Sequence, residues 1–236
     1  MTARAIVILT GAGISQESGL DTFRDANGLW SKVRIEDVAT QEAFRRDPER
    51  VHAFYNARRK AMAAAALHPN SAHCALAELE RRWRGEFLLV TQNIDALHER
   101  AGSARFLHMH GELLKARCGA CDGVHAHEGD LTLSTPCPTC RRLGAMRPHV
   151  VWFGEMPLFM EEIEAALATC DLFLSIGTSG QVYPAASFVR EASGRGAHTV
   201  ELNLEPSEGA SRFAEAHYGK ASQVVPAYVE RLLAEG

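Results

Sequence analysis

The chain has 236 residues, of which 46% are hydrophobic and 23% charged, and its formal net charge is −4. This length and composition are typical of a globular protein with one large core and room for a small insertion. The weak negative charge, without a long basic stripe, argues against a nucleic-acid groove, and no apolar run approaches the ~20 residues of a membrane helix.

The N-terminal segment reads as the first buried strand. Five apolar residues, Ala5 to Leu9, precede a glycine turn, whereas a secretion signal needs a longer apolar region and a cleavage site. We therefore expect a cytoplasmic protein with neither a membrane nor a nucleic acid as partner.

Apolar segments and helical patterns then alternate along the chain. The expected strands cover residues 5–10, 86–92, 105–110, 149–153, 171–177 and 198–203. The expected helices cover residues 41–66, 71–83, 159–169, 184–193 and 222–234. Near-continuous apolar strands separated by helices predict the α/β class, a Rossmann-like parallel sheet with helices on both faces.

Two segments interrupt this alternation. Residues 19–40 are polar and contain glycine, which indicates a loop, and residues 112–147 hold two cysteine pairs. We expect a single domain, 1–236, with a small zinc-ribbon and helical part inserted into it. The large part is expected at about 1–37, 67–111 and 146–236, and the small part at about 38–66 (helical) and 112–145 (cysteine-rich).

The turn after the first expected strand is rich in glycine and should open a helix. Gly11 and Gly13 fit the GxGxxG pattern that binds a dinucleotide phosphate at a helix N-terminus, but Gln16 replaces the third glycine. An acidic residue about 20 residues later, as in many dehydrogenases, is also missing. The turn alone leaves two readings open, a phosphate site and a purely structural turn.

Two CxxC pairs stand 15 residues apart and predict a metal site. Their members are Cys118, Cys121, Cys137 and Cys140. Four thiolates suit a tetrahedral Zn²⁺ that is coordinatively closed, so its role is to fold a small ribbon and not to activate water. His125 and His127 lie between the pairs and could replace a ligand, but we expect them to face solvent.

Further motifs occur in a fixed order along the chain: GAGISxESG, TFR and GLW, TQNID at 91–95, HMHG at 108–111, the CxxC pairs, GTS at 177–179 and NLE at 203–205. This series resembles the sirtuins, the NAD-dependent protein lysine deacylases, from about residue 5 to about residue 230. The resemblance implies NAD as co-substrate, one structural Zn²⁺, and acyl-lysine proteins or peptides as substrates.

The same resemblance implies an NAD site. Gly11 to Ser15 should hold the pyrophosphate, Phe23 and Arg24 should close over the nicotinamide ribose, and Asp95 should accept the carboxamide N–H bonds. The full set of expected cofactor contacts is Gly11, Ala12, Gly13, Ile14, Ser15, Glu17, Ser18, Thr22, Phe23, Arg24, Trp30, Gln92, Asn93, Ile94, Asp95, Gly177, Thr178, Ser179, Asn203, Leu204, Glu205 and Ala221.

Strand alternation places His108 and His110 on one face and does not choose between them. The sirtuin pattern has its catalytic histidine directly before glycine, which implies that His110 is the general base toward the cofactor ribose. In the implied mechanism the acyl oxygen attacks the anomeric carbon of NAD, nicotinamide leaves, and an alkylimidate forms. Water then releases lysine and 2′-O-acyl-ADP-ribose.

Two segments, 149–155 and 177–184, resemble the edges between which a sirtuin inserts its substrate strand. The expected substrate contacts there are Val151, Phe153, Gly154 and Glu155. Main-chain pairing of this kind implies a broad range of peptide sequences.

The stretch AFYNARRK places Tyr55 and Arg58 three residues apart on one helix face. By periodicity alone this is a solvated basic face, and we expect Arg59 and Lys60 to remain so. The stretch also resembles the YxxR of sirtuins that prefer acyl groups with a carboxylate, which implies desuccinylase and demalonylase activity with some deacetylase activity. Ala39 is expected to widen the floor of the acyl tunnel.

Two other functions use the same motifs. The NAD site could support mono-ADP-ribosyl transfer to proteins, or the chain could be a non-catalytic module that binds NAD and zinc. Nicotinamide release and labelling of protein by NAD distinguish these alternatives from deacylation.

Overall fold

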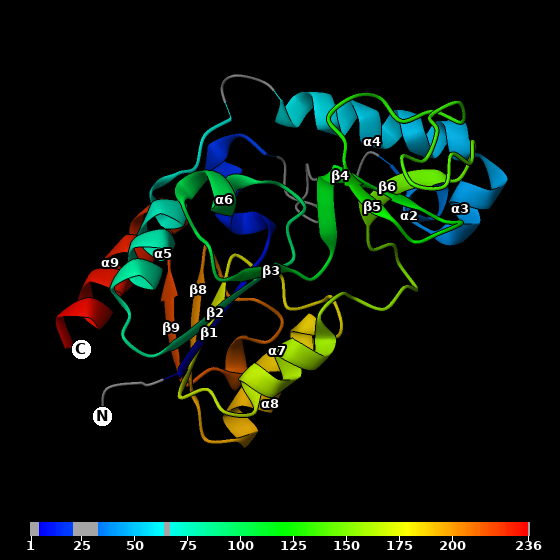
Figure 1. Cartoon of the computed structure of the whole chain (residues 1–236). Coiled ribbons are helices and arrows are strands. Elements are labelled where there is room, and N and C mark those ends of the chain that lie inside the picture. The colour runs from blue at the N-terminus through cyan, green and yellow to red at the C-terminus, as the bar shows by residue number, and fades with distance from the viewer. Residues whose placement is uncertain (1–4, 21–32, 64–66, 236) are drawn as a thin grey trace.

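The computed structural model describes residues 5–20, 33–63 and 67–235. Four expected cofactor contacts, Thr22, Phe23, Arg24 and Trp30, lie outside these residues. A large sheet flanked by helices forms one region of the molecule, and a smaller region of helices and short strands lies beside it (Figure 1). In the described ranges, no helix has the length and apolar character needed to span a bilayer.

The large region is built on a six-stranded sheet whose strand pairs are all parallel. Its order is β3-β2-β1-β7-β8-β9. The strands are β1 Ala5–Thr10, β2 Glu86–Thr91, β3 Phe106–His108, β7 Leu172–Ile176, β8 His198–Asn203 and β9 Glu215–Tyr218. The order reverses between β1 and β7, and ligands of open α/β sheets bind outside the carboxyl ends of strands at such a reversal. The Rossmann-like prediction is confirmed.

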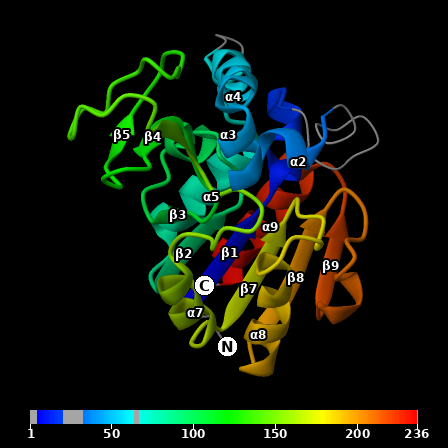
Figure 2. The same cartoon turned by 90° about the vertical axis from the view of Figure 1, so that its right-hand side faces the viewer.

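Helices cover both faces of this sheet, as Figures 1 and 2 show. Ile6 and Ile8 of β1 pack in one core with residues of α5 (Ser71–Arg82) and α9 (Ala221–Glu235). Val7 and Leu9 of the same strand pack in a second core with α7 (Met160–Leu167) and α8 (Phe188–Gly194). Because successive side chains point to opposite faces, a strand buried on both sides reads as one continuous apolar run.

Two elements of the large region were not predicted. The short helix α6, Leu97–Ala101, follows β2, and the edge strand β9 has an alternating pattern of exposed and half-buried residues. An edge strand of four mixed residues carries too weak an apolar signal to separate it from a loop.

The small region combines α2 (Ile35–Val38), α3 (Gln41–Arg46) and α4 (Pro48–Met62) with a three-stranded antiparallel sheet. The sheet order is β5-β4-β6, with β4 Gly111–Cys118, β5 Val124–Ala126 and β6 Met146–Val150. The single helix expected at 41–66 is broken, because Asp47 caps α4 by accepting the amide of Arg50 at 3.0 Å and Pro48 starts the new helix.

The strand expected at 149–153 was assigned to the wrong sheet. Residues Met146–Val150 form β6 and pair antiparallel with β4, and residues 151–153 leave this sheet. Phe153 then forms an isolated parallel bridge with Thr40. A short apolar run shows that a strand is buried but does not show against which sheet.

The prediction that Arg59 lies on a solvated face is also wrong. Its side chain is 1% exposed, and its guanidinium donates to the carbonyls of Leu113 at 3.1 Å and Gly129 at 3.1 Å. Residues i and i+4 share a helix face, so Arg59 lies on the buried face of Tyr55. Lys60 is exposed as expected and pairs with Asp130 at 2.8 Å.

Candidate functional site

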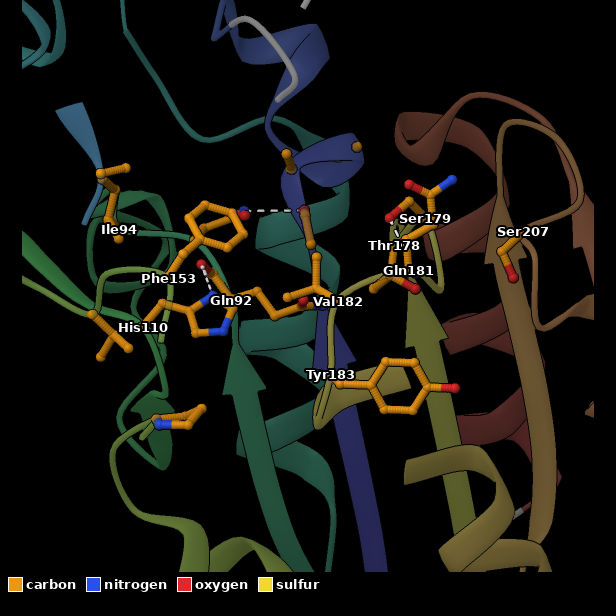
Figure 3. A pocket seen from close by; sticks show the side chains of 18 of the residues that line it. Gln92, Ile94, His110, Phe153, Thr178, Ser179, Gln181, Val182, Tyr183 and Ser207 are labelled. Atoms are coloured by element: carbon orange, nitrogen blue, oxygen red, sulfur yellow. Dashed lines mark hydrogen bonds between the residues drawn. The ribbon is translucent and has the colours of Figure 1, made fainter. Parts of the chain in front are cut away.

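A cavity of about 450 Å³ lies at the carboxyl ends of the parallel strands, between the large and the small region. Figure 3 shows His110, Gln92, Ile94 and Phe153 on one side of it and Thr178, Ser179 and Ser207 on the other. The structure brings together these expected site residues as its lining: Gly11, Ala12, Gly13, Ala39, Tyr55, Arg58, Gln92, Asn93, Ile94, His110, Val151, Phe153, Gly154, Glu155, Gly177, Thr178, Ser179, Asn203, Leu204 and Glu205.

In the cavity wall, at the point where the sheet order reverses, the backbones of two loops are in close contact. A Cβ atom on Gly11 would lie 2.7 Å from the carbonyl oxygen of Gly177, and one on Gly13 would lie 2.8 Å from the Gly177 Cα. Gly177 itself has φ +61°, and its Cβ would lie 2.5 Å from the amide of Ile14. Only glycine fits at this crossing, which brings the turn after β1 against the end of β7.

The glycine turn does not open the expected α-helix. It continues as two 3-10 turns, Ala12–Ile14 and Gln16–Ser18. The amides of Gly11 and Gly13 donate to the carbonyls of Ile176 and Gly177, both at 2.9 Å. These N–H groups are therefore satisfied within the protein. Gln16, which stands where a dehydrogenase has its third glycine, lines the cavity instead.

Two expected cofactor contacts lie behind the cavity wall. Ser15 donates to the Asp95 carboxylate at 3.1 Å, and the other carboxylate oxygen accepts the amide of Leu97 at 3.0 Å. Burial raises the pKa of Asp95. Asn93 donates its side-chain amide to Ser15 and to the carbonyl of Gly11, both at 3.1 Å. The buried pair thus fixes Asn93, which does line the cavity.

Four other expected cofactor contacts lie outside the cavity lining. Ile14 is fully buried in the core, and Glu17 accepts the amide and hydroxyl of Ser222 at 2.9 and 2.8 Å. The Ser18 hydroxyl accepts from Asn70 at 3.0 Å, and Ala221 begins α9. These contacts hold the first turn against α5 and α9, and a role in cofactor binding stays a prediction.

The two histidines of HMHG are separated, contrary to the shared face expected of them. The strand β3 ends at His108, so strand alternation does not extend to His110. His110 lines the cavity, whereas His108 is buried at 4% exposure. Of the two histidines, His110 is therefore the one that faces the cavity, and its catalytic role stays a prediction.

One ring nitrogen of His110 is held by a hydrogen bond, and the other can accept a proton. Its Nδ1 lies 3.1 Å from the carbonyl oxygen of Gln92, which can only accept, so Nδ1 carries the proton. Burial lowers the pKa of His110, against a smaller opposing effect of the Gln92 hydrogen bond. At neutral pH the ring is a neutral imidazole with an unprotonated Nε2, which is the form a general base requires.

The pKa of His108 is shifted in the opposite direction. Its Nδ1 lies 2.9 Å from the carbonyl of Asn93 and its Nε2 2.9 Å from the carboxylate of Glu99, so both nitrogens face acceptors. Burial opposes the charge, but the Glu99 hydrogen bond and charge outweigh it and raise the pKa of His108. This pair fixes the loop that carries Gln92 and Asn93.

One side of the cavity is lined by α4. Tyr55 is buried at 4% exposure and Arg58 is half-buried, and both line the cavity together with Phe54 and Ala39. Burial raises the pKa of Tyr55 to about 12, and the nearby charge of Arg58 lowers it by less. The phenol therefore stays protonated beside a guanidinium, a pair of donors suited to an anion.

The opposite side is lined by the loops after β7 and β8. Asn203 donates to the carbonyl of Thr178 at 2.9 Å, and its side-chain oxygen accepts the amide of Leu204 at 3.0 Å. The side chain of Asn203 thus ties the two loops together. Leu204 and Glu205 follow it on the cavity wall.

The cavity has further lining residues that are not among the site residues expected from the sequence: Gln16, Phe54, Val150, Pro157, Gln181, Val182, Tyr183, Pro206, Ser207 and Glu208. Most of them lie in loops without a periodic pattern. The available signals were the two segments expected to hold a substrate strand, 149–155 and 177–184, and proximity to the NLE motif and to Tyr55. Their chemistry alone would not have selected them.

The four cysteines of the small region form one cluster. Their sulfur atoms all lie within 4.8 Å of one another, with 3.7 Å between Cys118 and Cys140 and 3.6 Å between Cys121 and Cys137. Zinc–sulfur bonds of about 2.3 Å in a tetrahedron place sulfur atoms about 3.8 Å apart. All four thiols are free. The cluster fits a structural Zn²⁺, which these residues would hold without an open coordination position.

Comparisons with known proteins agree with this geometry. Residues 11–184 match the Sir2 family. The "NAD-dependent protein deacylase" of Escherichia coli (strain K12) is 60% identical over 228 residues, which are 97% of this chain and 82% of that protein.

Solved structures show the same similarity. A Sir2 homolog–NAD complex has a TM-score of 0.88 and 37% identity, covering 99% of this chain and 91% of that one. A Sir2 complex with a deacetylated p53 peptide and 3′-O-acetyl ADP ribose has a TM-score of 0.83 and 30% identity, covering 99% and 94%.

Proposed function

The chain belongs to the Sir2 family, and on that premise we propose that it removes succinyl and malonyl groups from lysine side chains, with some deacetylase activity. It is an NAD-dependent protein lysine deacylase, as the name of its E. coli relative and the NAD complex of its structural relative support. The products are nicotinamide, 2′-O-acyl-ADP-ribose and free lysine.

The preference for acidic acyl groups rests on one observation. Tyr55 and Arg58 line the same cavity as His110, so a cation and a neutral hydroxyl lie on the cavity wall that would meet an acyl chain. A terminal carboxylate can accept from both, whereas an acetyl group ends in a methyl that accepts nothing. Ala39, 3% exposed beside them, leaves room for the longer chain.

His110 is proposed as the general base. Its neutral ring, with the Nδ1 proton held by Gln92, presents Nε2 to the cavity as a proton acceptor. NAD, when bound, supplies the electrophilic ribose carbon and the hydroxyl that becomes acylated. The task of His110 is to take the proton of that hydroxyl.

The remaining cavity wall is proposed to hold the rest of NAD. Gly11, Ala12 and Gly13 offer a surface without side-chain bulk for the pyrophosphate, and Asn203 and Glu205 face the place for the adenine-side ribose. Gln92, Asn93 and Ile94 would surround the nicotinamide. The zinc ion takes no part in this chemistry, because four cysteines fill its coordination.

Acylated proteins or peptides are the substrates, and main-chain pairing is proposed to hold them. Most residues of the segment 150–157 and all three residues of the segment 181–183 line the cavity. Tyr183 is 68% exposed and Phe153 41% exposed there, as expected of residues that a peptide covers.

We also propose a cytoplasmic location, because all six cysteines are free thiols.

The test compares kcat/KM for one peptide carrying succinyl-lysine or acetyl-lysine. Arg58→Met is expected to lower the succinyl-to-acetyl ratio roughly 10- to 150-fold, because a charge-assisted hydrogen bond contributes about 1.5–3 kcal/mol. Lys60→Met is the matched control, since it removes the same charge from the exposed face of α4. A ratio that Arg58→Met leaves unchanged contradicts the assignment of Arg58.

A further inference from the structure

Trp152 lies against the acyl side of the cavity without lining it. Its side chain is 2% exposed, and its indole Nε1 lies 3.2 Å from the hydroxyl oxygen of Tyr55. Trp152 lies in the segment 149–155, but it is not among the substrate contacts expected from the sequence. Its contact is to the one neutral donor of the proposed acyl site.

The direction of this hydrogen bond is fixed by chemistry. An indole N–H can only donate, so the Tyr55 oxygen accepts and its own proton remains for another acceptor. Tyr55 has a pKa raised to about 12 by burial and so keeps that proton at any physiological pH. A hydroxyl that already accepts a hydrogen bond is also a better donor.

The indole ring is itself held in place. The guanidinium carbon of Arg147 lies 3.5 Å from the centre of the Trp152 ring. Arg147 also forms two hydrogen bonds to the Glu155 carboxylate, at 2.6 and 2.9 Å, and Glu155 accepts the backbone amide of Trp152 at 2.8 Å. Both the ring and the backbone of Trp152 are thus fixed by one ion pair.

We propose that Trp152 is a positioning residue for acyl selectivity, which orients the Tyr55 hydroxyl as a donor toward acyl groups that end in a carboxylate. The inference rests on the proposed function. Without the indole N–H, the hydroxyl loses its fixed acceptor role and can turn away from the cavity. The loss matters for an acyl carboxylate, which needs the donor, and far less for the methyl of an acetyl group.

Steady-state kinetics of the full chain with Trp152→Phe test this role. Phenylalanine keeps an aromatic ring under Arg147 and removes the N–H. KM for the succinyl peptide should rise about 3- to 10-fold with kcat within twofold, the effect of one neutral hydrogen bond. KM for the acetyl peptide should change less. In a Tyr55→Phe background, Trp152→Phe should lower the succinyl-to-acetyl ratio no further.

The outcomes separate this inference from the proposed function. Equal losses for both peptides, or a full additional loss in the Tyr55→Phe background, would show that Trp152 only packs, and would overturn the inference. A wild-type enzyme without succinyl preference overturns the proposed function itself. Trp83→Phe is the control, since Trp83 ends the distant helix α5 and should leave the ratio unchanged.

A measurement on the wild-type chain does not depend on the folding of Trp152→Phe. The indole N–H resonance that moves in Tyr55→Phe identifies Trp152 in a proton–nitrogen spectrum. Without NAD, the succinyl peptide should shift this resonance more than the acetyl peptide does, because a carboxylate bound to the Tyr55 hydroxyl polarises the shared hydrogen bond. Equal shifts contradict the proposal.

Discussion

The two ends of the cavity differ in what shapes them: backbone atoms at one end and side chains at the other. The end proposed to hold the cofactor, called the cofactor end, is shaped around Gly11, Gly13 and Gly177 by backbones in close contact. The end proposed to hold the acyl group, called the acyl end, is formed by Ala39, Tyr55, Arg58 and His110 and is shaped by side chains that their neighbours orient. Backbone contacts tolerate no added atom, whereas a side chain can be exchanged to change substrate choice. Three predictions test this difference.

The largest expected effect is on chemistry at the acyl end. His110→Ala removes the proposed base and should lower kcat about 10²- to 10⁴-fold. NAD affinity, measured by calorimetry, should change little, because the cofactor end is formed by other residues. His68→Ala, at an exposed position, is the control. Substantial turnover by His110→Ala would show that the base lies elsewhere.

A smaller effect is expected from one methyl group at the cofactor end. Gly177→Ala adds a Cβ only 2.5 Å from the Ile14 amide at φ +61°. The variant should lose about 2–3 kcal/mol of unfolding free energy in urea and bind NAD more weakly. Gly194→Ala, where no atom lies within 4 Å of the new Cβ, should be neutral or slightly stabilising. If Gly177→Ala and Gly194→Ala were equally stable, the idea that close backbone contacts shape the cofactor end would be contradicted.

The smallest expected effect is a gradual loss of folding stability as the pH falls. Burial lowers the pKa of His73 to about 4, and it also lowers the pKa of His98 well below 6.5. Both lie beneath the glycine turn, within reach of Ser15 and Thr10. Because the folded state holds them neutral, their contribution to stability is complete above pH 6.5 and is lost as pH falls from there toward 4.

Urea unfolding between pH 7 and pH 4.5 measures this loss, at up to about 1.4 kcal/mol per pH unit for each histidine. His108 has the opposite effect on stability, because its pKa is raised in the folded state. Its contribution is complete below pH 6.5 and is lost as the pH rises through that raised pKa. A stability that is flat in this window after allowance for His108 would contradict the burial of His73 and His98.

The sequence predicts the features that depend on local signals and misses those that depend on contacts between distant residues. The α/β class follows from apolar strands that alternate with helical patterns, a signal that is local. The sheet that β6 joins, the burial of Arg59 and the hydrogen bond from Trp152 to Tyr55 depend on residues that lie far apart in the sequence. Motif order located most of the lining residues. It could not show that Ser15 and Asp95 bond to each other behind the wall.

Helix α4 connects the proposed acyl site to the segment that carries the four-cysteine cluster. From adjacent turns it points Tyr55 and Arg58 into the cavity and Asn56 and Arg59 into the segment between the two cysteine pairs. Any loosening of that segment, by a chelator or by oxidation of a thiol, therefore reaches the acyl end through one rigid helix. Loss of a bound metal should therefore change the proposed acyl selectivity before the parallel sheet unfolds.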